Sequence, residues 1–124
     1  MAQAANREVT VFASAAYTAS QNSADLLNPY ARGVVVVIDA TASASTPSVV
    51  FTIKGKSSLG SDYYTILASA AITGTGTTVL RVYPGLTASA NLVASDVLPA
   101  VWRVEAVAGD ADSLTYSVAA NYIL

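Results

Sequence analysis

Hydrophobic and polar residues alternate most regularly in segment 101–108 (VWRVEAVA) of this 124-residue chain. Trp102 and Val104 fall on one side of an extended backbone, and Arg103 and Glu105 fall on the other. A period of two residues is typical of a β-strand with one face in a core and the other in water. The pattern therefore predicts a strand here, with Trp102 as a core residue rather than a surface residue that stacks on a ligand.

Segment 48–56 (SVVFTIKGK) shows the same alternation. It predicts that Phe51 and Ile53 are buried, while Lys54 and Lys56 share the opposite face. Two lysines on one strand face are most simply explained as residues that keep the edge of a sheet soluble.

Five further short segments are rich in β-branched or aromatic residues between turn-forming residues: 8–14, 33–41, 62–68, 77–83 and 114–118, with an extension of the last to 123 left open. Segment 33–41 is β-branched on both faces, which predicts a central strand covered on both sides. We expect 15–31 to be a loop with at most one helical turn at 24–27, and 88–96 to be either extended or a short helix. Seven or eight short strands predict an all-β fold, a single antiparallel β-sandwich or barrel.

The composition favours one domain, 1–124, in which residues 1–7 are expected to form a flexible or partner-docked arm. The chain is 53% hydrophobic, with six Lys and Arg and eight Asp and Glu residues, and it contains neither histidine nor cysteine. Without histidine and cysteine, a Ser-His-Asp triad, a Cys-His pair and most zinc sites are excluded within the chain. We therefore predict a structural or binding protein rather than an enzyme.

Charge and hydropathy also argue against nucleic acid and membrane partners. The net charge is −2 and the basic residues are scattered, whereas a nucleic-acid-binding protein gathers them on one face. The longest dense apolar run, 34–38, has five residues, compared with about 20 in a membrane-spanning helix. The N-terminal sequence has no basic region ahead of an apolar run, so no signal peptide is predicted and synthesis in the cytosol is expected.

Acidic residues give no convincing catalytic or metal site. Asp110 and Asp112 have the spacing that begins a calcium loop, but no further acidic residue follows, and a hairpin turn explains the pair. A pair of carboxylates for glycoside hydrolysis could be sought among several residues, but nothing favours one pair; the candidates are Asp39, Asp62, Asp96 and Glu105. We predict no catalytic residue, no metal ligand and no cofactor.

Seven tyrosines are the most informative candidates for contacts with a partner. Tyrosine joins a large apolar ring to a polar tip and is enriched at protein interfaces, although it is equally common inside strands. Tyr63 and Tyr64 are adjacent in a predicted strand, so they should point to opposite faces, one in the core and one at the surface. We predict partner contacts at Tyr30, Tyr63, Tyr83 and Tyr122, with core or strand-edge positions as the alternative.

Three segments resemble a family of small virion proteins of tailed bacteriophages: 31–42 (ARGVVVVIDATA), 51–87 (FTIKGKSSLG to RVYPGLT) and 98–124 (LPAVWRVEAV to NYIL). The resemblance implies a structural gene product and provides no catalytic or ligand residues. Within that setting, we expect a capsid decoration protein at the capsid surface, made in the host cytoplasm. Its expected partners are the major capsid protein and further copies of itself, as a homo-oligomer. The alternatives are a tail or head–tail connector component, or a carbohydrate- or receptor-binding module displayed on the virion.

Overall fold

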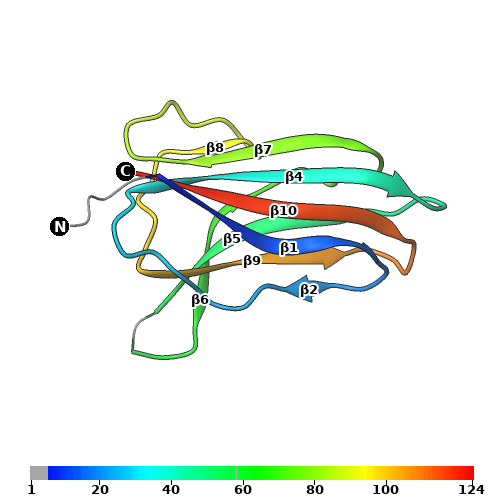
Figure 1. Ribbon diagram of the computed structural model, residues 1–124, viewed down its shortest axis with the longest axis horizontal. Coiled ribbons are helices and arrows are strands. Elements are labelled where there is room, and N and C mark those ends of the chain that lie inside the picture. Colours follow the sequence, from blue (N-terminus) through cyan, green and yellow to red (C-terminus); the bar gives the residue numbers. More distant parts are fainter. Residues whose placement is uncertain (1–5, 58) are drawn as a thin grey trace.

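The computed structural model describes residues 6–57 and 59–124, which form two β-sheets packed against each other (Figure 1). Sheet A has the strand order β1 (Arg7–Tyr17), β10 (Leu114–Ile123), β4 (Gly33–Ser43), β7 (Gly76–Val82) and β8 (Val93–Ala94). Sheet B has the order β2 (Gln21–Asn22), β9 (Val101–Ala108), β5 (Val49–Lys56) and β6 (Tyr63–Ala68), and β3 (Leu26–Leu27) also pairs with β9. The predicted all-β sandwich is confirmed, and the barrel alternative is wrong because two separate sheets form.

The seven strands with six or more residues coincide with the seven predicted segments. All pairings among these seven strands are antiparallel, whereas β8, within the ambiguous segment 88–96, pairs parallel with β7. The described residues contain no helix, and so none that could span a membrane. β1 begins at Arg7, inside the range predicted to be an arm, while residues 1–5 of that range lie outside the described residues.

The prediction of a loop over 15–31 is wrong in part. β1 continues to Tyr17, β2 and β3 follow, and 24–27 forms no helical turn. The Ser23 backbone N–H donates to the carbonyl oxygen of Val104 at 2.9 Å, and the Val104 N–H donates to the Ser23 hydroxyl at 3.0 Å. Pairing with the free edge of β9 therefore extends a segment whose small polar residues have little strand propensity of their own.

The core between the sheets contains the predicted residues. Phe51, Ile53 and Trp102 are fully buried, which confirms the inward faces assigned to β5 and β9. Trp102 packs edge-on against Tyr122 with ring centroids 5.9 Å apart, and its indole N–H donates to the Tyr122 hydroxyl at 3.1 Å. The Tyr122 hydroxyl donates in turn to the Leu27 carbonyl at 2.9 Å. The polar atoms of both aromatic side chains are thus satisfied inside the core.

Strand β4 is central in sheet A, as predicted, but only one of its faces is covered. Val34, Val36 and Ile38 point inward and are fully buried. Val35 and Val37, on the other face, are partly exposed. The prediction that both faces are covered is therefore wrong for the described chain, because sheet B packs on one side of sheet A only.

A second aromatic cluster lies at the inner face of sheet A. The ring of Tyr116 stacks on Tyr17 with centroids 4.5 Å apart and meets Phe12 and Phe51 edge-on. Tyr116 is 1% exposed, and its hydroxyl has no hydrogen-bond partner among the described residues. Burial raises the pKa of Tyr116 to about 12, because a phenolate would lose its hydration there.

Candidate functional site: the apolar end of the sandwich

The four tyrosines predicted to contact a partner come to the same end of the sandwich, the end at which β1 begins and β10 ends (left in Figure 1). Tyr122, Val34 and Val82 are register neighbours across β10, β4 and β7, so Tyr83 and Tyr30 lie close to Tyr122. Tyr63 begins β6 at this end, opposite the last residue of β5. The sheet register thus brings together residues up to 92 positions apart, Tyr30 and Tyr122.

These tyrosines differ in accessibility. Tyr30 is 73% exposed, whereas Tyr122 is 5% exposed and uses its hydroxyl within the core. Tyr83 is half-buried, and its hydroxyl donates to the Leu124 carbonyl at 2.8 Å. Tyr122 therefore has almost no surface that a partner could contact. Its hydrogen bond to the Leu27 carbonyl anchors the segment that exposes Leu27.

Several large apolar side chains are exposed at this end, and we define the apolar end by Leu27, Tyr30, Tyr64, Val97 and Leu124. Leu27 and Val97 are 73% and 57% exposed. Leu27 is the last residue of β3, just before the loop that leads to β4, and Val97 lies in the loop before β9; these two loops lie side by side. Several exposed large apolar side chains at one end of a domain are characteristic of protein–protein contact sites.

Asn28 joins the two loops of the apolar end. Its side-chain amide donates to the carbonyl oxygens of Ala31 at 2.8 Å and Leu98 at 3.1 Å. The Leu98 N–H donates to the Arg32 carbonyl at 2.9 Å, which ties the loops together a second time. Because Asn28 is 9% exposed, these bonds are shielded from water and hold Leu27 and Val97 in fixed positions.

Tyr64 completes the surface by lying over Gly55. A Cβ atom at Gly55 would collide with the Tyr64 ring and would come within 2.8 Å of the Pro99 ring. Tyr64 is 50% exposed and Tyr63 is half-buried on the outer face of sheet B. The two tyrosines point to opposite faces, as predicted. The prediction that one of them enters the core is wrong, because β6 is the edge strand of sheet B and Tyr64 lies at the margin of the core.

A shallow apolar hollow of about 290 Å³ adjoins the apolar end where sheet A meets the loop after β7. Its lining includes Val35, Arg81, Tyr83, Leu86 and Ile123. Val35 and Arg81 belong to the outer face of sheet A, and none of the residues that define the apolar end lines the hollow.

A cluster of charged side chains surrounds Tyr63 on the outer face of sheet B. The Tyr63 hydroxyl donates to Asp25 at 2.6 Å, and the Lys56 ammonium pairs with the same carboxylate at 2.8 Å. The guanidinium of Arg103 lies 3.7 Å from the Tyr63 ring centroid and pairs with Glu105, which also accepts from Lys54 at 3.2 Å. We call these residues the Tyr63 cluster: Asp25, Lys54, Lys56, Tyr63, Arg103 and Glu105.

The electrostatics of the Tyr63 cluster keep its side chains charged. Hydrogen bonds from Lys56 and Tyr63 lower the pKa of Asp25, and the bond to Asp25 raises the pKa of Lys56. Burial acts to raise the pKa of Glu105, but the hydrogen bonds from Arg103 and Lys54 outweigh it and lower the pKa. Both carboxylates therefore stay ionised near neutral pH, which suits ion pairing rather than proton donation to a substrate.

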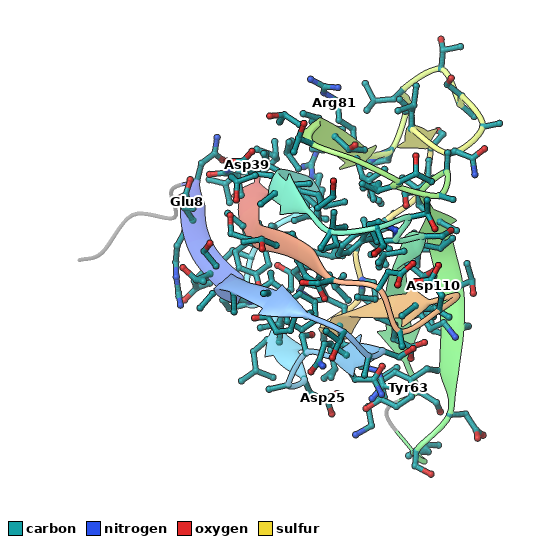
Figure 2. All side chains as sticks on the ribbon, turned by 90° about the vertical axis from the view of Figure 1, so that its right-hand side faces the viewer. Glu8, Asp25, Asp39, Tyr63, Arg81 and Asp110 are labelled. Atoms are coloured by element: carbon teal, nitrogen blue, oxygen red, sulfur yellow. The ribbon has the colours of Figure 1, made fainter. Side chains whose placement is uncertain are left out.

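The acidic residues considered for metal binding or catalysis are dispersed. The Asp112 carboxylate accepts from the backbone N–H and the hydroxyl of Thr46, both at 3.2 Å, and Asp110 caps the same turn. Asp39 lies on the outer face of sheet A (Figure 2). Glu105 lies on the outer face of sheet B, on the opposite side of the sandwich. Within residues 6–57 and 59–124, no group of three or more His, Cys, Asp or Glu side chains could hold a metal ion.

Sequence reasoning missed Leu27, Val97 and Tyr64 as surface residues. A usable pattern exists for the first two, because Leu27-Asn28-Pro29 and Val97-Leu98-Pro99 place large apolar residues next to proline turns, where loops are normally polar. No family model, no curated protein and no solved structure matches this chain.

Proposed function

We propose that this chain is a non-enzymatic capsid decoration protein of a tailed bacteriophage, and that it docks on the major capsid protein through the apolar end. The observation that carries the proposal is the exposure of Leu27, Tyr30 and Val97 in and beside two loops that Asn28 joins by hydrogen bonds. Rigid aromatic and aliphatic side chains on one surface are the usual anchors of protein interfaces. The resemblance of segments 31–42, 51–87 and 98–124 to tailed-phage virion proteins supports the choice of partner.

The low charge of the chain supports a docked working state. A surface with few charges is prone to association when left bare at high concentration. A protein that binds only the assembled lattice stabilises it by mass action, and repeated sites extend this effect over the shell.

The experiment mixes purified protein with mature, expanded capsids that lack it, and measures co-sedimentation and capsid heat resistance. We expect binding that depends weakly on ionic strength, because the apolar end provides few charges, and occupied capsids that withstand more heat than bare ones. Tyr30→Asp should weaken binding at least tenfold. Val107→Asp is the matched control, because Val107 is also 50% exposed but lies near the opposite end of β9.

Two outcomes would overturn the decoration role. If the protein ignores bare capsids at micromolar concentration and co-purifies with tails, the tail or connector role replaces it. If it binds a glycan array instead, and Tyr30→Asp abolishes that binding, a receptor-binding role replaces it.

A further inference from the structure

The outer face of sheet A carries apolar residues at its centre. Adjacent residues on β10, β4 and β7 form a row of Ala119, Val37 and Val79 that points away from the core. Val35 lies on one side of this row on β4, and Asp39, opposite Ser117 of β10, lies on the other. Apart from Leu86 at one corner, no part of the described chain packs over these side chains. An antiparallel sheet with one face in water normally places polar residues there, so this face is suited to burial.

The same face carries opposite charges at its two edges. Glu8 on β1, Asn121 on β10, Val35 on β4 and Arg81 on β7 form one continuous row across the sheet. Three strand spacings of about 4.8 Å separate the backbones of Glu8 and Arg81, about 14 Å in all. Within the described part of the chain, neither residue forms an ion pair. Figure 2 shows Glu8, Asp39 and Arg81 along this side of the molecule.

We propose that a second copy of this chain covers the outer face of sheet A in a two-fold symmetric dimer. The two-fold axis runs parallel to the strands, between β10 and β4. It places the outer face of one copy against the same face of the other, with the β1 edge of each copy over the β7 edge of its partner. Glu8 of each copy then lies over Arg81 of the other, while Val37 meets Ala119 at the centre. Such a contact is isologous, with each residue pair occurring twice.

The size of the face agrees with a moderate, reversible dimer. β7 has seven residues, and with about 3.3 Å per residue and about 4.8 Å per strand, a four-strand face covers on the order of 500 Å². Two copies then bury on the order of 1,000 Å², the lower limit for a specific interface. We expect a dissociation constant on the order of 1–100 μM. This inference does not depend on the proposed function, because docking uses the apolar end and leaves this face free.

The test reverses the charges one at a time. Glu8→Arg should place arginines opposite each other at both edges of the dimer, and Arg81→Glu should do the same with glutamates, so each variant alone should dimerise at least tenfold more weakly. An equimolar mixture of the two variants restores both complementary pairs, and it should form a heterodimer about as tight as the wild-type dimer. Sedimentation equilibrium over a range of concentrations measures the dissociation constants of the wild-type dimer, of the two variant homodimers and of the heterodimer.

Arg32→Glu is the matched control, because it changes the net charge as Arg81→Glu does but lies outside the face, beside the apolar end. It should leave the dimer unchanged. The proposal is overturned if the wild type stays monomeric up to about 1 mM, or if dimers form that ignore both reversals or are not restored by mixing. Capsid binding by the monomeric variants, measured separately, distinguishes a failure of this interface from a failure of the decoration role.

Discussion

The outer faces of sheets A and B use charge in opposite ways. On sheet B, Lys54 and Arg103 lie on either side of Glu105 and pair with it, and the Tyr63 ring lies beneath the guanidinium. On sheet A, the central row holds Ala119, Val37 and Val79, Glu8 and Arg81 lie at the two edges, and Asp39 lies on β4 without an ion pair among the described residues. One face follows the usual pattern of a sheet in contact with water, and the other does not.

The difference between the two outer faces reflects the uneven distribution of the few charged residues. Five of its charged side chains belong to the Tyr63 cluster, from a total of six basic and eight acidic residues. Opposite charges on neighbouring strands stabilise a sheet, and they leave no unsatisfied group for a partner to cover. The outer face of sheet B is therefore complete in the single chain, whereas the apolar end and the outer face of sheet A gain from being covered.

The largest expected effect is a loss of stability on replacing a core residue of β9. It tests which side chains of that strand point into the core and which lie on the outer face of sheet B. Trp102→Ala should lower the free energy of unfolding by about 3–5 kcal/mol, because it leaves a cavity in the core. It also leaves the Tyr122 hydroxyl without its indole donor. Urea unfolding at neutral pH measures the loss.

Arg103→Ala, the next residue along β9, is the control for Trp102→Ala. Its side chain lies on the outer face of sheet B, where removing an ion pair costs about 1 kcal/mol or less. Similar losses for the two variants would mean that Trp102 is no more buried than Arg103, and a larger loss for Arg103→Ala would mean that the two faces of β9 have been exchanged.

The fold could be predicted because alternation along one strand depends on that strand alone. In β5 and β9, one face meets the core and the other meets water, so the two-residue period identified Phe51, Ile53 and Trp102 as buried. The pattern failed for β4, because valines on both faces look the same whether the second face is covered within the chain or left for a partner.

The candidate site could be predicted only in part. The structure brings the four tyrosines to one end of the sandwich, which the sequence did not predict. Whether a ring is buried depends on distant partners, and Tyr122 is buried by Trp102 and by the segment at Leu27. The clamp at Asn28 joins residues 70 positions apart, Asn28 and Leu98, a contact that no local pattern contains.

The second prediction sharpens the contrast between the two outer faces. Glu105→Gln should lower the free energy of unfolding by about 1 kcal/mol at pH 7, because Arg103 and Lys54 lose a charged partner. The folded chain lowers the pKa of Glu105, so its stabilisation is present above the ordinary glutamate pKa and disappears as the pH falls through the folded value. The difference in urea midpoint between wild type and variant should therefore shrink as the pH is lowered below the ordinary glutamate pKa.

Glu8→Gln is the matched control on sheet A. Glu8 forms no ion pair within the described residues of one chain, so in dilute solution the variant should change the free energy of unfolding by less than about 0.5 kcal/mol. A loss at Glu8 as large as that at Glu105 would contradict the view that only sheet B has a completed outer face.

The smallest effect concerns the two buried tyrosines of β10. Like the two outer faces, one has its polar group paired within the chain and the other does not. The Tyr122 hydroxyl bonds to Trp102 and Leu27, whereas the Tyr116 hydroxyl has no partner among the described residues. Tyr116→Phe removes a polar group that is buried without compensation, so the free energy of unfolding should stay constant or rise by up to about 1 kcal/mol at pH 7. Tyr122→Phe, the matched control, should lower it, since it leaves the indole N–H and a carbonyl unpaired.

Alkaline titration separates the hydroxyl of Tyr116 from simple changes in packing. Burial raises the pKa of Tyr116 to about 12 in the folded chain, whereas an unfolded tyrosine ionises near pH 10. The folded state then holds a proton that the unfolded state releases, so stability falls as the pH rises from about 10 to 12. Tyr116→Phe cannot ionise and should lose less stability than the wild type over this interval, as measured by urea unfolding at pH 9 and pH 11. An equal loss in both proteins would mean that Tyr116 ionises as freely in the fold as in the unfolded chain, and that its hydroxyl is in contact with water.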